Sequence, residues 1–176
     1  MNIYKQKFTK LQQSIMNVLY DYPTTTFNQR ELAQTLHVSP TAIAKALPEL
    51  EQEALITREK KKRIAITLND TEEVRSHKRL ANMLKLHASG IVEMLTDTYP
   101  SATVVLFGSY SKGDDTERSD IDIAIVGTKE KRISLQQFEE ALSRTINIQH
   151  FPSWKIDKHL KESIINGVIL YGYIAL

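Results

Sequence analysis

Hydrophobic residues in the first third of the chain recur at the three- and four-residue spacing of helices. The buried face of an opening helix is expected to consist of Phe8, Leu11, Ile15, Val18, Leu19 and Tyr22. A short helix is expected over about Gln29–Leu36, with Thr26 or Asn28 as its N-cap. A third helix should begin after Ser39, and Pro48 within it is expected to kink or interrupt it.

Short β-type runs and a long helical stretch follow. Residues 55–57 and 64–68 predict two strands joined by a basic turn. Residues 71–98 predict one long helix, bent at Ser89–Gly90, with His87 as a hydrogen-bonded core histidine. The inward face of this helix is expected to consist of Leu80, Met83, Leu84, His87, Ile91, Met94 and Leu95.

The remainder of the chain alternates between strand and helix patterns. Strands are expected over 103–107, 119–126 and 147–151, helices from about Ser134 and over 157–167, and a buried run over 168–172. This order predicts an α/β (α+β) fold class with a small mixed β-sheet and helices in the C-terminal part. We place the domain boundary near residue 70, which gives domains over 1–70 and 71–176.

Composition and charge narrow the function classes. With 41% hydrophobic residues in 176, the chain can form a globular core. It has no cysteine, which excludes disulfides, thiolate zinc sites and cysteine nucleophiles. No apolar run suits a membrane span and the N-terminus lacks a secretory signal, so we expect a cytoplasmic protein without a membrane partner. Residues 1–70 contain 10 of the 23 basic and 7 of the 21 acidic residues, so this part is mildly basic.

The order helix, helix, turn, helix and hairpin with a basic tip resembles the winged helix-turn-helix family of DNA-binding domains over residues 8–68. The matching residues are Arg30-Glu31-Leu32-Ala33, Val38-Ser39-Pro40, Ala42-Ile43, Ala46-Leu47, Leu50 and Leu55-Ile56, with Ala54 where the family often has glycine. The resemblance implies that the third helix enters the major groove and that the hairpin, the wing, touches the DNA. The implied contacts are Ser39, Thr41 and Lys45 on the helix and Arg58, Lys60, Lys61, Lys62 and Arg63 on the wing.

This resemblance leaves two readings open. Double-stranded DNA is the expected partner, because a basic wing neutralises phosphates. A protein that reads two DNA half-sites also needs a second copy, so we expect a homodimer. The alternative is a module for dimerisation or protein docking, with a lysine-rich tip that is only a solvated turn.

A short motif in the second domain carries candidate chemistry. Gly108-Ser109 follows a predicted strand, and ten residues later Asp120-x-Asp122 opens the next strand. Residues i and i+2 of a strand point to one face, so the two carboxylates can share a Mg²⁺ ion. Gly108 permits close backbone approach, and Ser109 offers an N–H and a hydroxyl to phosphate oxygens. An acidic, solvated strand edge would explain one exposed aspartate, but not the pair together with the Gly-Ser turn.

The string Phe107-Gly108-Ser109-(x10)-Asp120-Ile121-Asp122 resembles the polymerase-β nucleotidyltransferase superfamily, in particular its minimal nucleotidyltransferases. Gly113 and Ser119 also match. The resemblance implies that Gly108, Ser109 and Ser119 hold a nucleoside triphosphate, with ATP as the expected donor. Asp120 and Asp122 would be the catalytic residues that bind Mg²⁺. The implied reaction transfers a nucleoside monophosphate to a hydroxyl of a protein, nucleic-acid or small-molecule acceptor.

A third carboxylate of the family is missing where we expect it. The predicted strand 147–151 has the amides Asn147 and Gln149 there, His150 should point to the opposite face, and Asp157 should begin the last helix. Two functions therefore stay open. The chain is either a Mg²⁺-dependent nucleotidyltransferase, which we favour, or a DNA-binding transcriptional regulator whose degenerate transferase domain senses nucleotide.

Overall fold

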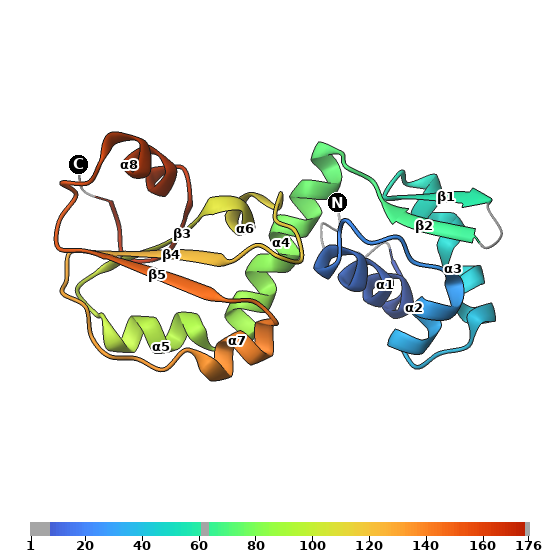
Figure 1. The fold of residues 1–176 in the computed structure, drawn as a ribbon, viewed down its shortest axis with the longest axis horizontal. Coiled ribbons are helices and arrows are strands. Elements are labelled where there is room, and N and C mark those ends of the chain that lie inside the picture. The colour runs from blue at the N-terminus through green and yellow to red at the C-terminus, as the bar shows by residue number, and fades with distance from the viewer. Residues whose placement is uncertain (1–7, 61–63, 175–176) are drawn as a thin grey trace, which may run out of the picture. The chain divides into compact units, whose positions relative to one another are not determined.

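The chain folds into two units of secondary structure, each with its own hydrophobic core (Figure 1). The computed structural model describes residues 8–60 and 64–174. The units are Met1–Val74 and Arg75–Leu176, whereas the sequence analysis placed the boundary near residue 70. No helix within the described residues is both long enough and apolar enough to cross a bilayer.

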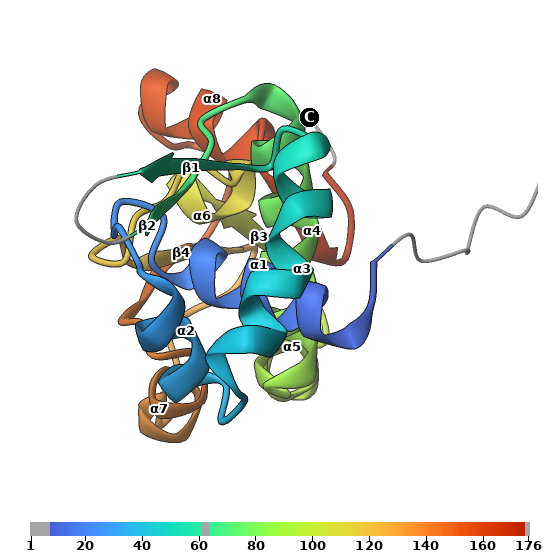
Figure 2. The same ribbon diagram turned by 90° about the vertical axis from the view of Figure 1, so that its right-hand side faces the viewer.

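The first unit is a winged helix-turn-helix domain, as predicted (Figure 2). Its elements are α1 (Lys10–Asp21), α2 (Gln29–Thr35), α3 (Pro40–Gln52), β1 (Ile56–Lys60) and β2 (Ile64–Leu68). The strands form an antiparallel hairpin, and Phe27 adds an antiparallel bridge to Ile66. The helices bury their apolar faces completely at positions such as Ile15, Leu32 and Leu47, which form the core.

Local sequence signals explain the helix starts in this unit. Asn28, rather than Thr26, caps α2, and Glu31 completes a capping box with it. Ser39 caps α3. The expected interruption at Pro48 is wrong, because α3 continues through this residue to Gln52. Pro48 is exposed, so water can hydrogen-bond the carbonyl that the proline leaves without its helical partner.

The second unit has a mixed sheet with helices on both faces. Its elements are α4 (Glu72–Ala88), whose first residues belong to the first unit, α5 (Ile91–Thr98), β3 (Thr103–Phe107), α6 (Gly108–Lys112), β4 (Ile121–Val126), α7 (Gln136–Leu142), β5 (Ile146–Phe151), α8 (Lys158–Ile165) and β6 (Val168–Tyr171). The strand order is β5-β4-β3-β6, and only the β4–β5 pair is parallel.

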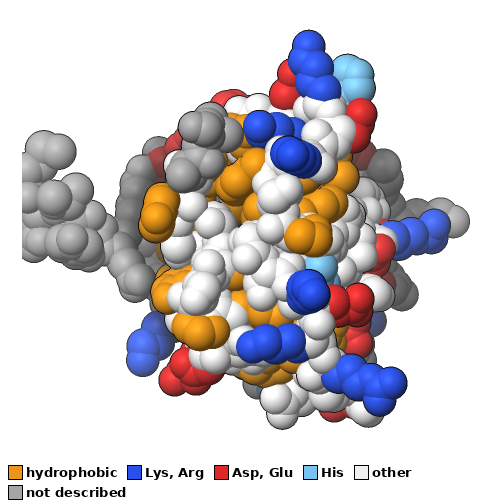
Figure 3. Space-filling view, turned by 90° about the vertical axis from the view of Figure 1, so that its left-hand side faces the viewer, with side chains coloured by type: hydrophobic (Ala, Val, Ile, Leu, Met, Phe, Trp, Pro, Cys, Tyr) orange, Lys and Arg blue, Asp and Glu red, His pale blue; other side chains and the backbone are white. Residues whose placement is uncertain are grey.

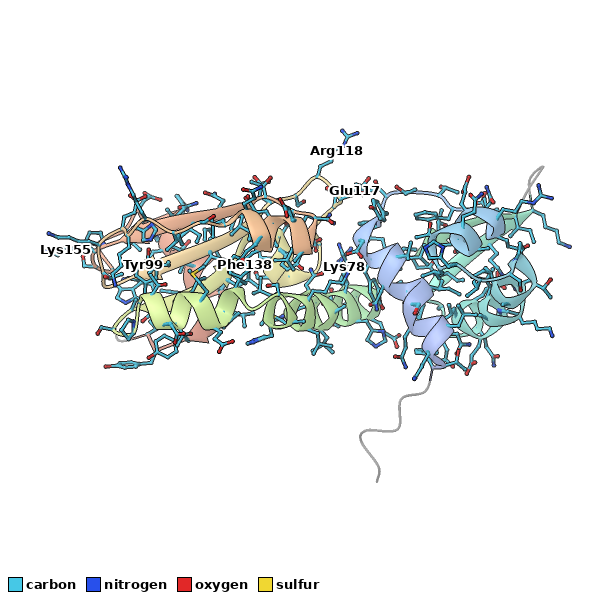
Figure 4. The ribbon with its side chains drawn as sticks, turned by 90° about the horizontal axis from the view of Figure 1, so that it is seen from below. Lys78, Tyr99, Glu117, Arg118, Phe138 and Lys155 are labelled. Atoms are coloured by element: carbon cyan, nitrogen blue, oxygen red, sulfur yellow. The ribbon has the colours of Figure 1, made fainter. Side chains whose placement is uncertain are left out.

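Two hydrophobic clusters cover the two faces of this sheet. Tyr99 and Phe138 lie between the sheet and the helices of one face, as Figure 4 shows, and Ile164 of α8 packs with Trp154 on the other. The run 168–172 was expected to be buried, but β6 forms an edge of the sheet, and Ile169 is 45% exposed. The two central strands of this sheet, β3 and β4, are buried along most of their length. Their burial fixes the positions of the residues at the strand ends.

The structure corrects the predicted long helix over 71–98. Gly90 adopts a left-handed conformation with φ +82° and separates α4 from α5. Leu80 and Leu84 are 64% and 72% exposed, and His87 is exposed rather than a core histidine. The buried face of α4 within the second unit is instead the series Lys78, Asn82 and Leu86. The predicted inward stripe was wrong there because Lys78 and Asn82, rather than Leu80 and Leu84, face inward and bond to the polar α6–β4 loop.

A matched pair of glycine substitutions tests how tightly α4 packs on this loop. Gly90 and Gly113 have φ values of +82° and +81°, but a Cβ at Gly113 would lie 2.3 Å from the Arg75 carbonyl oxygen, whereas none lies near Gly90. Alanine costs about 1–2 kcal/mol at either site for the left-handed backbone. We expect Gly113→Ala to lower the free energy of unfolding by a further 1–3 kcal/mol or so, through overpacking.

The measurement is denaturant unfolding followed by the fluorescence of Trp154, the single tryptophan of the chain, which reports on the second unit alone. Gly90→Ala is the control for backbone strain. Equal losses for the two variants would contradict close packing of α4 on Gly113.

Candidate functional site

The Gly-Ser turn and the second aspartate of the motif lie side by side at one end of the sheet. Phe107, the last residue of β3, pairs with Asp122 on the antiparallel strand β4. Gly108 follows directly and begins α6. Asp120 is exposed and immediately precedes β4. The structure therefore brings together Gly108 and Asp122, which are fourteen positions apart in the sequence, through strand pairing.

Gly108 is in contact distance of the Asp122 carboxylate. Its φ is +73°, and a Cβ at this position would lie 2.5 Å from Asp122 Oδ2. Any side chain larger than hydrogen would therefore displace the carboxylate or the turn. Ser109 is partly exposed in the first turn of α6, and Ser111 Oγ donates a hydrogen bond of 2.8 Å to the Gly108 carbonyl oxygen. The turn is thus held close to the acid without a side chain between them.

Asn147 lies on the other side of Asp122. It is the Asp122 partner in the parallel β4–β5 register, and its Nδ2 donates a hydrogen bond of 3.0 Å to Asp122 Oδ1. Gln149 pairs with Ala124, one pleat further along the sheet. The strand expected to provide a third acid thus places an amide, not a carboxylate, beside Asp122.

The donor set suits a hard divalent cation with few protein ligands. Among the described residues, no three His, Cys, Asp or Glu side chains gather as a complete metal cage. Mg²⁺ usually needs no such cage, because it takes one or two carboxylates and completes its shell with waters and substrate phosphates. Asn147 occupies one lone pair of Asp122 Oδ1, and a carboxylate oxygen has another. Asp122 therefore keeps a lone pair that can accept a divalent cation.

Ser119 lies in the turn that precedes Asp120. Its Oγ accepts a hydrogen bond of 2.9 Å from the Thr116 backbone N–H, and its own N–H donates to the Thr116 carbonyl oxygen at 3.1 Å. The hydroxyl therefore closes the turn. Ser119 was predicted as a nucleotide contact, and the structure gives its side chain a role in holding the loop.

His150 lies away from the acidic pair, on the opposite face from Asn147 as predicted. It pairs with Ile125 toward the far end of β4, and its Nε2 is 3.0 Å from the Tyr99 hydroxyl. Burial lowers the pKa of the His150 imidazole below its usual range, against the opposing influence of Glu130. A hollow of about 390 Å³ next to it is lined by residues that include Lys131 and Ile148. His150 therefore offers no base to the motif.

The surface at this far end of the sheet is chemically mixed. Figure 3 shows hydrophobic side chains interspersed with lysine and arginine side chains on that face of the second unit. Ile169 and Tyr173 are among the exposed hydrophobic residues.

The predicted DNA-contact residues of α3 are exposed. Thr41 and Lys45 are one helical turn apart on the same side of the helix. Ser39 Oγ accepts a hydrogen bond of 3.1 Å from the Ala42 N–H, so its hydroxyl caps the helix. The side chains of Thr41 and Lys45 are exposed and are not used as helix caps.

The basic residues of the wing differ in whether their side chains are already bound within the first unit. Arg58 Nε donates a hydrogen bond of 2.8 Å to Glu51 on α3, and this contact lowers the pKa of the Glu51 carboxyl. Arg58 therefore ties the wing to α3. Lys60 is exposed at the end of β1, while the predicted contacts Lys61, Lys62 and Arg63 lie outside the described residues.

Sequence reasoning missed a buried polar cluster beside the motif. Lys78 and Asn82 of α4 and Asp115 of the α6–β4 loop are each at most 3% exposed. Lys78 Nζ lies 3.0 Å from Asp115 Oδ1, and Asn82 Nδ2 donates to the same oxygen at 2.8 Å. The only signal in the sequence was the four-residue spacing of Lys78, Asn82 and Leu86, which hydrophobic periodicity does not detect.

Both units match models of known protein families. The family model described as "Polymerase beta, Nucleotidyltransferase" matches residues 90–173, and that of "Bacterial regulatory proteins, gntR family" matches residues 4–66. The Methanocaldococcus jannaschii protein named "Putative protein adenylyltransferase" is 30% identical over 104 residues. The match covers 58% of this chain and 87% of that protein.

Among the solved structures similar to this chain are transcription regulators. MepR, a regulator of the Staphylococcus aureus multidrug efflux pump MepA, is 20% identical with a TM-score of 0.43, over 52% of this chain and 69% of MepR. BldR of Sulfolobus solfataricus is 22% identical with a TM-score of 0.40, over 53% of this chain and 65% of BldR.

The M. jannaschii relative is matched over most of its length, and the family model covers the Gly-Ser turn and both aspartates. Nucleotidyltransferases of this family typically use divalent metal ions. The chain therefore belongs to the polymerase beta nucleotidyltransferase family and has an N-terminal winged helix-turn-helix domain.

Proposed function

We propose that the second unit binds ATP with Mg²⁺ and transfers AMP to a hydroxyl group of a protein acceptor. The observation that carries the proposal is the close approach of Gly108 to Asp122, where a Cβ would lie 2.5 Å from Oδ2. We propose that the turn accepts phosphate oxygens and that the carboxylate beside it binds the metal ion. The choice of AMP and of a protein acceptor is supported by the name of the M. jannaschii relative.

The reaction follows from the residues around the turn. The acceptor oxygen attacks the α-phosphorus of ATP, the bond to the bridging oxygen breaks, pyrophosphate leaves, and the hydroxyl proton passes to solvent. Gly108 and Ser109 would hold phosphate oxygens through backbone N–H groups and the Ser109 hydroxyl. Asp120 and Asp122 would hold Mg²⁺, which when bound neutralises charge on the triphosphate.

Asn147 sets the limits of this chemistry. Its amide donates to Asp122 Oδ1 at 3.0 Å and therefore orients the carboxylate, but it cannot accept the proton of the attacking hydroxyl. This observation favours a second candidate function, a DNA-binding regulator in which the transferase unit senses nucleotide without turnover. Detectable transfer separates the two.

For the first unit we propose contact with double-stranded DNA in the cytoplasm. Thr41 and Lys45 form an exposed polar edge on α3, and Lys60 leads into the basic wing tip. The match to the gntR family of bacterial regulatory proteins supports this proposal. A homodimer would place two α3 helices on successive half-sites of the duplex.

Substitution of Asp122 tests the proposed transferase. We expect the wild-type protein to transfer label from α-phosphate-labelled ATP to protein only with Mg²⁺, and Asp122→Asn to lose the transfer by at least about a hundredfold. The neutral side chain keeps the size of the original but binds the cation weakly. Label is counted on the acceptor after electrophoresis of a cell extract treated with the protein. Asp97→Asn, an exposed acid on α5, is the matched control.

Equal labelling by wild-type protein and Asp122→Asn would rule out this site. Mg²⁺-dependent ATP binding in the wild type, measured by calorimetry and lost in Asp122→Asn without any label transfer, would favour the nucleotide sensor instead.

Replacing Asn147 with an acid tests whether the lack of a proton acceptor at this position limits the rate of transfer. Asn147→Asp would place a carboxylate in register with Asp122, where it could accept the hydroxyl proton. General bases contribute about 10²–10⁴ in rate, and we expect an increase in Mg²⁺-dependent transfer of at least about tenfold. Gln149→Glu adds the same charge beside Ala124 and should give no comparable increase. An unchanged rate in Asn147→Asp would show that proton removal does not limit transfer.

Salt dependence tests the DNA contact. If Lys45 neutralises a phosphate, Lys45→Ala should weaken binding to a mixed-sequence duplex and reduce the slope of log K against log salt by about one. Fluorescence anisotropy over a salt series gives both quantities. Lys155→Ala, an exposed lysine of the second unit labelled in Figure 4, is the control and should leave the slope unchanged. Identical slopes for wild type and Lys45→Ala would exclude Lys45 from the interface.

A further inference from the structure

The polar cluster of Lys78, Asn82 and Asp115 joins α4 to the loop within the motif. Lys78 Nζ, besides its ion pair with Asp115 Oδ1, donates to the Asp115 backbone carbonyl. Both charged side chains are almost completely buried, at 2% and 1% exposure. Figure 4 labels Lys78 on α4, together with Glu117 and Arg118 at the outer end of the same loop.

Asn82 connects both halves of the motif through a single nitrogen atom. Its Nδ2 donates to the Tyr110 carbonyl oxygen of α6 at 3.0 Å and to Asp115 Oδ1 at 2.8 Å. The helix α6 begins with Gly108 and Ser109, and the loop that holds Asp115 leads to Asp120. The distance between the Gly-Ser turn and the first aspartate is therefore fixed by a residue outside the motif.

The rest of the loop is fixed on each side of Asp115. The backbone at Gly113 packs against α4 so closely that a Cβ would meet the Arg75 carbonyl oxygen. After Asp115, the hydrogen bonds between Thr116 and Ser119 close the turn that ends at Asp120. The fixed position of Asp115 is thereby transmitted over a short, closed segment to Asp120.

Stability alone does not explain this cluster. A buried ion pair is commonly no more stable than well-packed apolar residues of the same volume. Here Asp115 Oδ2 is also buried without a hydrogen-bond partner, which adds a cost. What the cluster does provide, and apolar side chains cannot, is directional bonds to the Tyr110 and Asp115 carbonyl groups.

We propose that Asn82 and Lys78 are positioning residues that hold the Gly108-Ser109 turn and Asp120 at the separation needed to bind a metal–nucleotide complex. The inference rests on the proposed nucleotide-binding function. Neither residue touches the nucleotide; both act through the loop. Removing the Asn82 amide should therefore weaken metal–nucleotide binding through Asp120, while the fold is kept.

The test is a double-mutant cycle between Asn82 and Asp120. Mn²⁺ serves as the probe, and its affinity is measured by electron paramagnetic resonance with the non-hydrolysable analogue α,β-methylene-ATP. We expect Asn82→Leu, which keeps the side-chain size, to weaken Mn²⁺ binding about tenfold, equivalent to 1.4 kcal/mol or so. In the Asp120→Asn background the same substitution should have almost no further effect. Leu84→Asn, on the exposed face of α4, is the matched control.

The outcomes separate the two proposals. Absence of nucleotide-dependent Mn²⁺ binding in the wild-type protein would overturn the proposed function and this inference with it. Binding in the wild type with equal losses from Asn82→Leu in both backgrounds would overturn the positioning role alone. Trp154 fluorescence reports whether the second unit is folded, and Asn82→Ser replaces Asn82→Leu if the latter unfolds.

Discussion

The pairing of Phe107 with Asp122 is the constraint on which the candidate site depends. It aligns the end of β3 with the start of β4, so that the turn after β3 begins beside a carboxylate. A side chain at the next position would displace the carboxylate, because a Cβ at residue 108 would reach Asp122 Oδ2. The parallel β4–β5 pair then fixes the third neighbour, Asn147. The chemistry of the motif is therefore a consequence of strand register.

Strand pairing positions Asp122 but does not position Asp120, which precedes β4. Asp120 is positioned by the α6–β4 loop. This loop is in turn held by α4, which precedes the motif in the chain. Two of the buried positions of α4 are polar for this reason: Lys78 and Asn82 meet backbone carbonyls and a carboxylate of the α6–β4 segment. A hydrophobic helix face could cover the loop but could not fix its position.

These relationships separate what could be predicted from what could not. The motif, the strands on either side of it and the amide at residue 147 are local features, and sequence spacing was sufficient to find them. The buried face of α4 depends on what packs against it, and hydrophobicity selected Leu80 and Leu84, which are exposed. Pro48 was misjudged for a related reason, because propensity does not reveal that an exposed carbonyl can bond to water. The contact between Gly108 and Asp122 could not be predicted in this way, because it depends on the register in which β3 pairs with β4.

Asn147 is best understood through the electrostatics of the site before a cation binds. Carboxylates that converge without a counter-charge repel each other, and one of them takes up a proton. A third acid in register with Asp122 would increase this repulsion, whereas an amide in its place donates a hydrogen bond to Asp122 Oδ1. The Asn147 amide thereby orients the Asp122 carboxylate. At residue 147 the chain has an amide that orients Asp122, in place of a carboxylate that could accept a proton. We expect this arrangement to favour nucleotide binding over fast turnover. A slow transferase and a nucleotide sensor are thus two outcomes of one arrangement, distinguished by how readily the acceptor hydroxyl loses its proton.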